Sequence, residues 1–327
     1  MSITFTVIIP VYNCEQYLRR CLDSVLDQSY QSFDVICIDD NSPDNSKDIL
    51  KEYTDKYPDK IRALYNEENM GQGQSRMKGV NLSDADYIVF VDSDDYLSPD
   101  YLQSFADALK EEKYDTVFEG YTKDIEGKLK KNDIYDSMWT LVCYPLACCK
   151  AFRREFLIQN RIDFSAERTG EDIYFAMAVF YHMKSFKVIH EYGYHYIMNP
   201  KSTTMTITAD KQLERSVAGM FKRFLSKHDI NALSEERKRM LEYAYASNMV
   251  NALVVYARGC GKEKMRQKYD YFFNDFKEQF PDYKSNPYFS PFKSKKVSLK
   301  IRTGVDVTMT LHKMGIAWPL FRLIAAM

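Results

Sequence analysis

Residues 86–95 read Asp86-Tyr87-Ile88-Val89-Phe90-Val91-Asp92-Ser93-Asp94-Asp95. The first part is a short apolar run of β-branched and aromatic residues, which is typical of a buried strand. Three carboxylates follow at the point where that strand ends. Because the carboxyl ends of strands in an open α/β sheet face the crevice where ligands bind, this order predicts a functional site at the edge of a sheet.

The acidic cluster has two interpretations. Carboxylates this close repel one another unless a cation or hydrogen-bond donors compensate them. Oxygen ligands of this kind suit Mg²⁺ or Mn²⁺, usually shared with the phosphates of a substrate. The alternative is a cluster that caps a helix, because Ser98-Pro99-Asp100 begins a plausible helix. The ends of the other strands decide between the two.

Strand and helix patterns alternate through the first hundred residues. Strands are predicted at 7–9, 35–38, 61–65 and 87–91, separated by helices at 15–27, at 46–56 and up to about residue 80. This order predicts an α/β fold with a doubly wound, mostly parallel, Rossmann-like sheet. From residue 210 onward the pattern is helical. The predicted domains are therefore 1–209, carrying the site, and 210–327, mainly helical.

The bulk composition excludes several classes of protein. The chain has 327 residues, of which 45% are hydrophobic and 28% charged, as in an ordinary globular protein. The net charge of −1 gives no basic field for nucleic acid. The seven cysteines fit no metal-ligand spacing and predict reduced thiols in a cytoplasmic protein. The N-terminus lacks the basic region and the longer apolar core that a signal peptide would show, and without a run of eighteen apolar residues no membrane-spanning helix is predicted.

The tail differs from the rest of the chain. Residues 293–327 contain seven Lys or Arg and a single acid, Asp306, interleaved with apolar residues that include Trp318. A basic amphipathic segment of this kind can lie in the interface of an anionic bilayer. The alternatives are packing on the helical domain and formation of homo-oligomers. The composition thus predicts a cytoplasmic chain, with peripheral contact to the inner face of the plasma membrane as one outcome.

Polar residues also follow the other predicted strands. The first strand leads into Pro10-Val11-Tyr12-Asn13, the second into Asp39-Asp40, and the third into a loop with Gly71 and Gly73. Glycines permit close backbone approach, but this Gly-x-Gly lacks the third glycine of a dinucleotide fingerprint. A nicotinamide site would also place its glycines after the first strand. These residues therefore predict a nucleotide site of another kind.

An aromatic ring, an acid and an arginine around one crevice suit a nucleotide. Tyr12 can stack on a base, and Asp39 can accept the N3–H of uracil. Arg76, on the helix after the glycine loop, can reach the base or the phosphates. Next to these residues, the acidic cluster at Asp92 and Asp94 is better explained as a metal and phosphate site than as a helix cap.

In their order and spacing, these motifs resemble the inverting family 2 glycosyltransferases, whose nucleotide-binding domain has the GT-A fold. The resemblance covers about the first 205 residues and is carried by residues 7–13, 38–44, 69–76, 92–95 and 170–172. It implies a UDP-sugar donor with Mn²⁺ or Mg²⁺ on its diphosphate. It also implies transfer of a hexose to a carbohydrate acceptor hydroxyl, on a lipid or protein carrier, in bacterial surface-polysaccharide or glycoconjugate synthesis.

The resemblance also assigns residues by position. The implied donor-binding residues are Pro10, Tyr12, Asn13, Asp39, Asp40, Asn69, Gly71, Arg76, Asp92 and Ser93. Asp94 is the implied direct metal ligand, and Asp92 would hold the ribose or metal-bound waters. His195, in an aromatic strand, could complete the metal shell, although a structural role is the alternative. Asp95 is expected only to cap the following turn.

Inverting transfer also needs a base on the acceptor side of the donor sugar. Asp172 is the expected base and Glu171 its alternate, at the start of a helix predicted over residues 173–183. The alternative for both is a pair of helix N-terminal acids stabilised by the helix dipole. The rival function from another class is a non-catalytic nucleotide-sugar-binding or interaction module, which would bind a donor without turning it over.

Overall fold

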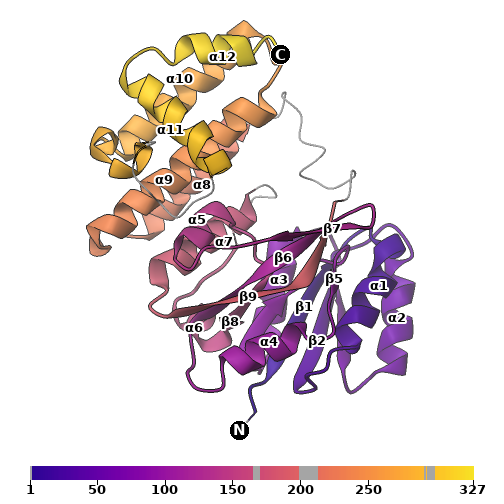
Figure 1. Cartoon of the computed structure of the whole chain (residues 1–327). Helices are drawn as coiled ribbons and strands as arrows, with labels where there is room; N and C mark the ends of the chain where they lie inside the picture. Colours follow the sequence, from indigo (N-terminus) through magenta and orange to yellow (C-terminus); the bar gives the residue numbers. More distant parts are fainter. Residues whose placement is uncertain (1, 165–169, 199–212, 291, 293–298) are drawn as a thin grey trace. The chain divides into compact units, whose positions relative to one another are not determined.

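Figure 1 presents a computed structural model of the chain, which describes residues 2–164, 170–198, 213–290, 292 and 299–327. Its internal packing defines two units. The first comprises Met1–Asp136 and Leu146–Asn199, and the second comprises Ser137–Pro145 and Pro200–Met327. The predicted boundary between residues 209 and 210 lies outside the described residues.

The first unit begins with the alternating pattern that the periodicity predicts. Its parallel strands lie in the order β3-β2-β1-β4 and are β1 (Phe5–Val11), β2 (Phe33–Asp39), β3 (Ile61–Tyr65) and β4 (Tyr87–Phe90). The helices between them are α1 (Glu15–Leu26), α2 (Ser46–Lys56) and α3 (Gln72–Leu82). Every residue of β1 and β4 is buried, which explains why these strands are nearly continuous apolar runs. The predicted α/β fold is confirmed.

The rest of the sheet is mixed. Within the described residues it has nine strands in the order β3-β2-β1-β4-β8-β6-β9-β5, with β7 paired to β6. The added strands are β5 (Tyr96–Leu97), β6 (Thr116–Ile125), β7 (Lys128–Asn132), β8 (Lys150–Arg153) and β9 (Phe186–Ile197). Strand β8 runs antiparallel to both of its neighbours, β4 and β6, so the unbroken parallel run ends at β4; beyond β8, strands β6 and β9 pair in parallel again. The predicted loop or irregular hairpin at 121–136 contains the regular β6–β7 hairpin.

The order of the strands places a topological switch point between β1 and β4. After β1 the chain moves through β2 to β3, and it then returns through α3 to the other side of β1. The carboxyl ends on either side of such a switch open onto the ligand crevice. Helix α3 packs close to β1 because residue 79 is glycine: a Cβ there would lie 2.6 Å from Ile8 Cγ2. Arg76, three residues earlier, lies on the same side of α3.

The remaining helices of the first unit are α4 (Tyr101–Ala108), α6 (Arg154–Gln159) and α7 (Glu171–His182). An aromatic core joins α7 to the sheet. Phe90 of β4 contacts three rings, those of Phe152, Phe164 and Phe175. Phe164 and Phe175 stack at a centroid distance of 4.2 Å. These ring contacts hold the start of α7 near the end of β4.

The second unit is helical, as predicted. It contains α5 (Trp139–Cys143), α8 (Leu213–Lys227), α9 (Glu235–Asn251), a π-helical turn (Ala252–Tyr256), α10 (Lys262–Gln279), α11 (Leu299–Lys313) and α12 (Trp318–Ile324). Tyr245 of α9 stacks on Phe221 of α8 and meets Phe276 of α10 edge-on. Helix α5 lies between β7 and β8 in sequence but belongs here, because Trp139 packs against Tyr243.

The tail contributes helices α11 and α12 to this unit. Phe321 of α12 packs against Tyr269 of α10 at 5.0 Å, and α11 contacts α9. The described part of the tail thus packs on the helical unit, which was one of the predicted alternatives; residues 293–298 lie outside the described residues. Among the described helices, none has the length and apolar character needed to cross a bilayer.

We expect Gly79→Ala to destabilise the protein by about 1 kcal/mol or more, because the added methyl group collides with Ile8 and overpacking outweighs the gain in helix propensity. Urea unfolding followed by circular dichroism measures this. Gly304→Ala is the matched control, since no atom lies within 4 Å of its Cβ. That change should stabilise α11 by up to about 1 kcal/mol. Equal effects of the two substitutions would contradict the close packing of α3.

Candidate active site

The centre of the site is the guanidinium of Arg76, which bridges two acids from distant parts of the chain. Its Nη1 donates to Asp172 Oδ1 at 2.7 Å, and its Nη2 donates to Asp92 Oδ1 at 2.6 Å. Arg76 is fully buried (0% exposed), and its charge also lies 5.3 Å from the centre of the Phe164 ring. A buried charge requires such partners. Arg76 therefore ties the end of β4 to the start of α7.

The two acids at the start of α7 differ in their surroundings. Glu171 is buried and accepts a short hydrogen bond from Gln72 Nε2 of α3, whereas the Asp172 side chain keeps 26% of its surface exposed. Burial raises the pKa of Asp172 to about 6; the charge of Arg76 opposes this rise, and Glu171 adds to it. Asp172 is thus the accessible acid of the pair, with a pKa nearer to neutrality than usual.

The adjacent acids after β2 also differ. Asp40 accepts hydrogen bonds from the backbone N–H groups of Met70 (2.9 Å) and Gly71 (2.7 Å) and from Asn66 Nδ2 (2.8 Å). The Asp40 carboxylate thus holds the glycine loop in place, while its predicted contact with the donor stays a prediction. In Asp39, Oδ2 accepts from the Ser42 N–H at 3.2 Å, but the buried Oδ1 has no partner among the described residues. An unpaired buried carboxylate oxygen is costly, and it marks where a ligand donor can bind.

The other residues predicted to bind the donor surround these acids. Pro10 is buried within β1 and lies opposite Ile38 in the register. Tyr12 is half exposed, so its ring is available for stacking. Asn13 has a left-handed φ of 52°, which asparagine tolerates, and its N–H donates to Ser42 Oγ at 3.3 Å. Ser93 is buried, and Asn69 belongs to the loop held by Asp40.

A buried tyrosine holds the acidic turn after β4. Tyr194 Oη donates to Asp95 Oδ2 at 2.6 Å and accepts the N–H of Asp92 at 3.2 Å. Asp95 Oδ1 accepts the N–H of Ile197 at 2.7 Å. Asp95 was predicted only to cap the following turn. Instead, it links the turn after β4 to β9. The sequence offered little signal for this, because Tyr194 lies 99 residues away from Asp95.

His195 is not brought to the carboxylates, contrary to its prediction as a metal ligand. Its ring stacks on Tyr96 at 4.4 Å, and its Nε2 lies 2.8 Å from Ser98 Oγ. Adjacent residues of a strand point to opposite faces, and Tyr194 occupies the face toward the acids. The next residue on that face is Tyr196, whose pKa is raised by burial and then by the charges of Asp95, Asp92 and Asp94.

Asp92 and Asp94 are the residues that would hold a divalent cation. Burial first, and then the charges of Asp92 and Asp94, raise the pKa of Asp95, so the three carboxylates lie close enough to repel one another. A cation would relieve this repulsion. Within the described residues, no group of three or more His, Cys, Asp or Glu forms a complete metal site. Two carboxylates nevertheless fit a cation that completes its shell with water and substrate phosphates.

Lys150 of β8 is a buried cation of the site that the sequence analysis missed. Its Nζ donates to the carbonyl oxygens of Leu146 at 2.5 Å and Cys148 at 3.3 Å. Burial lowers the pKa of Lys150, while Cys149, Cys148 and Asp172 oppose that shift. The ammonium therefore acts on the same acid that Arg76 binds. No local motif around residue 150 distinguishes it from an ordinary surface lysine.

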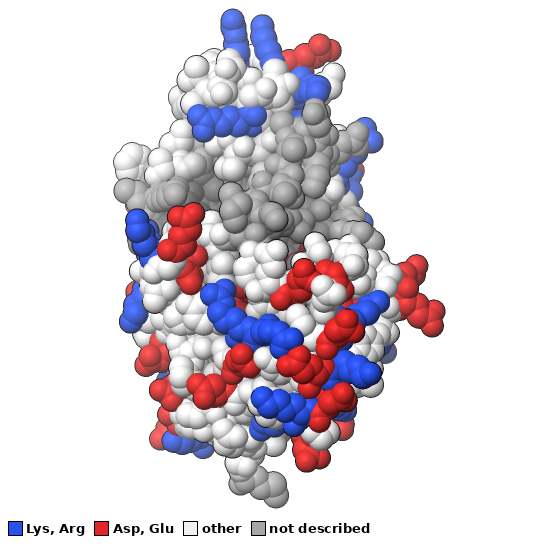
Figure 2. Space-filling view, turned by 90° about the vertical axis from the view of Figure 1, so that its right-hand side faces the viewer, with Lys and Arg blue, Asp and Glu red and all other residues white. Residues whose placement is uncertain are grey.

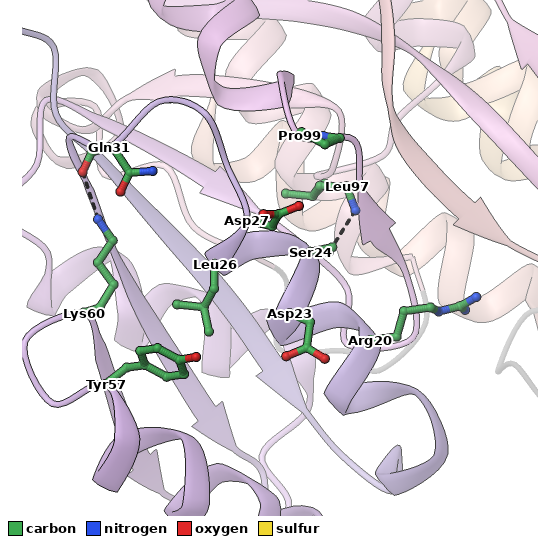
Figure 3. A pocket seen from close by; sticks show the side chains of 10 residues that line it. All are labelled: Arg20, Asp23, Ser24, Leu26, Asp27, Gln31, Tyr57, Lys60, Leu97 and Pro99. Carbon is green, nitrogen blue, oxygen red and sulfur yellow. Dashed lines mark hydrogen bonds between the residues drawn. The ribbon is translucent and has the colours of Figure 1, made fainter.

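A separate groove of about 1020 Å³ lies along α1 and contains none of the predicted site residues (Figure 3). Several of its polar groups are already paired: Ser24 Oγ accepts the Leu97 N–H at 3.0 Å, and Lys60 Nζ donates to the Gln31 carbonyl at 2.8 Å. Its lining carries both acids and bases, such as Asp23 and Arg20. It is therefore distinct from the candidate active site.

The family follows from a comparison with known proteins. Residues 6–187, more than half of the chain, match the model of glycosyl transferase family 2. The chain belongs to this family. The family 2 glycosyltransferase matches the S. aureus TarS 1–349 structure in complex with UDP-GlcNAc with a TM-score of 0.72 and 18% identity, over 99% of its own length and 90% of that chain. This likeness confirms the GT-A-like fold.

The family 2 glycosyltransferase is also similar in sequence to two relatives of known name. It is 30% identical over 212 residues to a poly(ribitol-phosphate) β-glucosyltransferase of Bacillus spizizenii, covering 62% of this chain and 33% of that protein. It is 26% identical over 221 residues to the poly(ribitol-phosphate) β-N-acetylglucosaminyltransferase TarP of Staphylococcus aureus, covering 63% of this chain and 66% of that protein. The family 2 glycosyltransferase thus spans about a third of the length of the B. spizizenii relative.

We expect Tyr194→Phe to lower the free energy of unfolding by about 1–3 kcal/mol, because the Asp92 N–H and Asp95 Oδ2 both lose the hydrogen bond to the buried tyrosine hydroxyl. Tyr192→Phe is the matched control on the same strand, since its hydroxyl makes an exposed hydrogen bond to Asp133. That change should alter stability by less than about 0.5 kcal/mol. Urea unfolding compares the two variants, and equal losses would rule out the anchoring role of Tyr194.

Proposed function

We propose that this protein transfers a hexose from a UDP-sugar to a carbohydrate acceptor hydroxyl, with inversion at the anomeric carbon. Family membership supports a glycosyltransferase. The activities of two relatives, which transfer glucosyl and N-acetylglucosaminyl groups to poly(ribitol-phosphate), support a hexose or N-acetylhexosamine donor and a polymer as acceptor. The UDP-GlcNAc complex of S. aureus TarS supports a UDP-linked donor.

The observation that carries this proposal is the bridge formed by Arg76. One buried guanidinium binds both Asp92, on the proposed donor side, and Asp172, on the proposed acceptor side. The metal and diphosphate corner and the candidate base therefore lie within the reach of a single side chain. Displacement at one sugar carbon places the leaving group on one face and the base on the other, and the closeness of Asp92 and Asp172 to Arg76 supports such an arrangement.

The nucleotide would lie at the carboxyl ends of β1 and β2. The unpaired Oδ1 of Asp39 would accept the N3–H of uracil, which supplies the hydrogen bond that this buried oxygen lacks. The exposed ring of Tyr12 would stack on the base. The loop held by Asp40 ends at Gly71, whose φ of 91° suits a glycine where the backbone begins α3.

The proposed reaction is a single displacement. The acceptor hydroxyl oxygen attacks the anomeric carbon on the face opposite the diphosphate, the bond between that carbon and the phosphate oxygen breaks, and UDP leaves. Asp172 takes the proton of the acceptor hydroxyl. A divalent cation held by Asp94 and Asp92 would neutralise the charge that develops on the leaving diphosphate. Arg76 keeps Asp172 in position in the free protein.

The proposed setting is bacterial surface-polysaccharide or glycoconjugate synthesis, on an acceptor with a lipid or protein carrier. We place the chain in the cytoplasm, at the inner face of the plasma membrane. A non-catalytic nucleotide-sugar-binding module is the alternative, and it would show saturable binding without release of UDP.

A panel of UDP-hexoses and UDP-N-acetylhexosamines should show UDP release that requires Mn²⁺ or Mg²⁺ and stops on chelation. We expect Asp94→Asn to lower this rate by about 100-fold or more, because the cation supplies several kcal/mol of charge stabilisation. Asp59→Asn, at an exposed acid outside the site, is the control and should keep the full rate. Saturable donor binding without UDP release would favour the binding module, and metal-independent release would remove the cation from the proposal.

We expect Asp172→Asn to lower the transfer rate by about 10²–10⁴-fold and to leave UDP binding intact, because the amide cannot accept the proton. In the unaltered protein, kcat/KM should fall about tenfold per pH unit below about pH 6, where the Asp172 carboxylate becomes protonated. Initial rates across pH measure this. Full turnover by Asp172→Asn would show that another group is the base, and Glu171→Gln would then be the next variant.

A further inference from the structure

Exposed apolar residues lie at and around the end of helix α12. Leu323, in the last turn of the helix, and Met327, three residues after its end, expose 63% and 64% of their surfaces. Ile316, just before the helix, is half exposed. Val255, in the π-helical turn that contacts α12, is 56% exposed. We call these four residues and the cations beside them the C-terminal face.

The opposite side of α12 is fully used for packing. Phe321 is completely buried and packs against Tyr269 and Phe273 of α10. The backbone N–H of Gly259 donates to the Ile324 carbonyl at 3.2 Å, which fixes the end of α12 to the loop before α10. Leu323 therefore lies on a well-anchored helix and is not needed for its packing.

Three exposed cations border this apolar surface. Arg322 precedes Leu323, Arg258 Nη2 lies 3.8 Å from Met327 Sδ, and Lys262 begins α10. None of the three forms an ion pair with an acid of the described part of the chain, whereas nearby Arg266 is paired with Asp270 at 2.7 Å. Figure 2 shows Lys and Arg side chains, with an acidic side chain beside them, at the uppermost end of the helical unit. The three cations that border the apolar residues are thus not held in ion pairs within the described residues.

The positive charge of the C-terminal face distinguishes between two kinds of partner, a second copy of the chain and an anionic bilayer. A second copy docked through the same surface would bring like charges together across a two-fold axis, which is unfavourable. An anionic bilayer supplies negative headgroups for the cations and an apolar interior for the side chains of Leu323 and Met327. Each Lys or Arg near such a surface strengthens binding by roughly fivefold.

We propose that the C-terminal face docks this protein on an anionic lipid surface. The inference rests on the proposed setting at the membrane, but it requires no glycosyl transfer. Docking through this face would hold the chain peripherally, without a spanning helix, where an acceptor on a lipid carrier is presented.

Co-sedimentation with vesicles tests the proposal on the full chain. Binding to vesicles of phosphatidylcholine and phosphatidylglycerol should be about 100-fold tighter than to phosphatidylcholine alone, and should weaken as salt screens the cations. The double variant Arg258→Glu and Arg322→Glu should lose at least about tenfold in affinity for the anionic vesicles. Leu323→Asp should also weaken binding, because it removes the apolar contact and adds a like charge to that of the lipid.

Matched substitutions elsewhere control for general effects. Leu129→Asp, at a 59% exposed position of β7, and Lys51→Glu, at an exposed position of α2, should leave vesicle binding unchanged. Circular dichroism confirms that each variant is folded. Equal binding to neutral and anionic vesicles, or no effect of the C-terminal variants, would overturn the proposal. So would a dimer in light scattering that Leu323→Asp disperses while the unaltered chain fails to bind vesicles.

A measurement of UDP release distinguishes a failure of this inference from a failure of the proposed function. The C-terminal variants should keep the metal-dependent UDP release of the unaltered protein in the absence of lipid, since they lie outside the candidate active site. Loss of vesicle binding with intact release would concern only the C-terminal face. Vesicle binding without any UDP release would instead overturn the proposed function.

Discussion

The buried charge of Arg76 is the constraint on which the first unit depends. A guanidinium that has lost its water needs acids around it, and Arg76 finds them at Asp92 and Asp172. This pairing requires that α3 lie close to β1, which Gly79 permits, and that α7 begin near the end of β4, which the rings of Phe164 and Phe175 secure. Apolar packing and charge pairing therefore specify the same arrangement.

The acids of the site lie next to or near one another in the sequence, and their surroundings give them different roles. The Asp40 carboxylate accepts hydrogen bonds from two backbone N–H groups, whereas one carboxylate oxygen of neighbouring Asp39 has no hydrogen-bond partner among the described residues. Glu171 is buried against Gln72, and Asp172 remains partly exposed. In the turn after β4, Asp95 is tied to Tyr194. In each case one acid builds the scaffold and another faces the crevice, so the number of carboxylates in a motif overstates the number available for chemistry.

Local sequence patterns were enough to predict the first four strands, the helices between them and the gathering of polar residues at the strand ends. Those features depend on periodicity within a few residues and on the rule that strand ends face ligands. The roles of Tyr194, Lys150 and Asp95 were not predictable in this way. Their environment depends on residues far away in sequence, as in the bond between Tyr194 and Asp95. His195 was misassigned for the same reason, since the face on which a strand residue lies depends on pairing register.

The path of the chain through α5 has a consequence for how the protein is made. Helix α5 is synthesised between two strands of the first unit, yet Trp139 packs against Tyr243 and Tyr288 of the second. On a ribosome, Tyr243 is made about 100 residues after Trp139, and Tyr288 about 150 residues after it, so this tryptophan finds its partners late. A fragment that ends at residue 209 would lack both partner rings. The burial of Trp139 therefore depends on the helical unit, although its helix interrupts the sequence of the first unit.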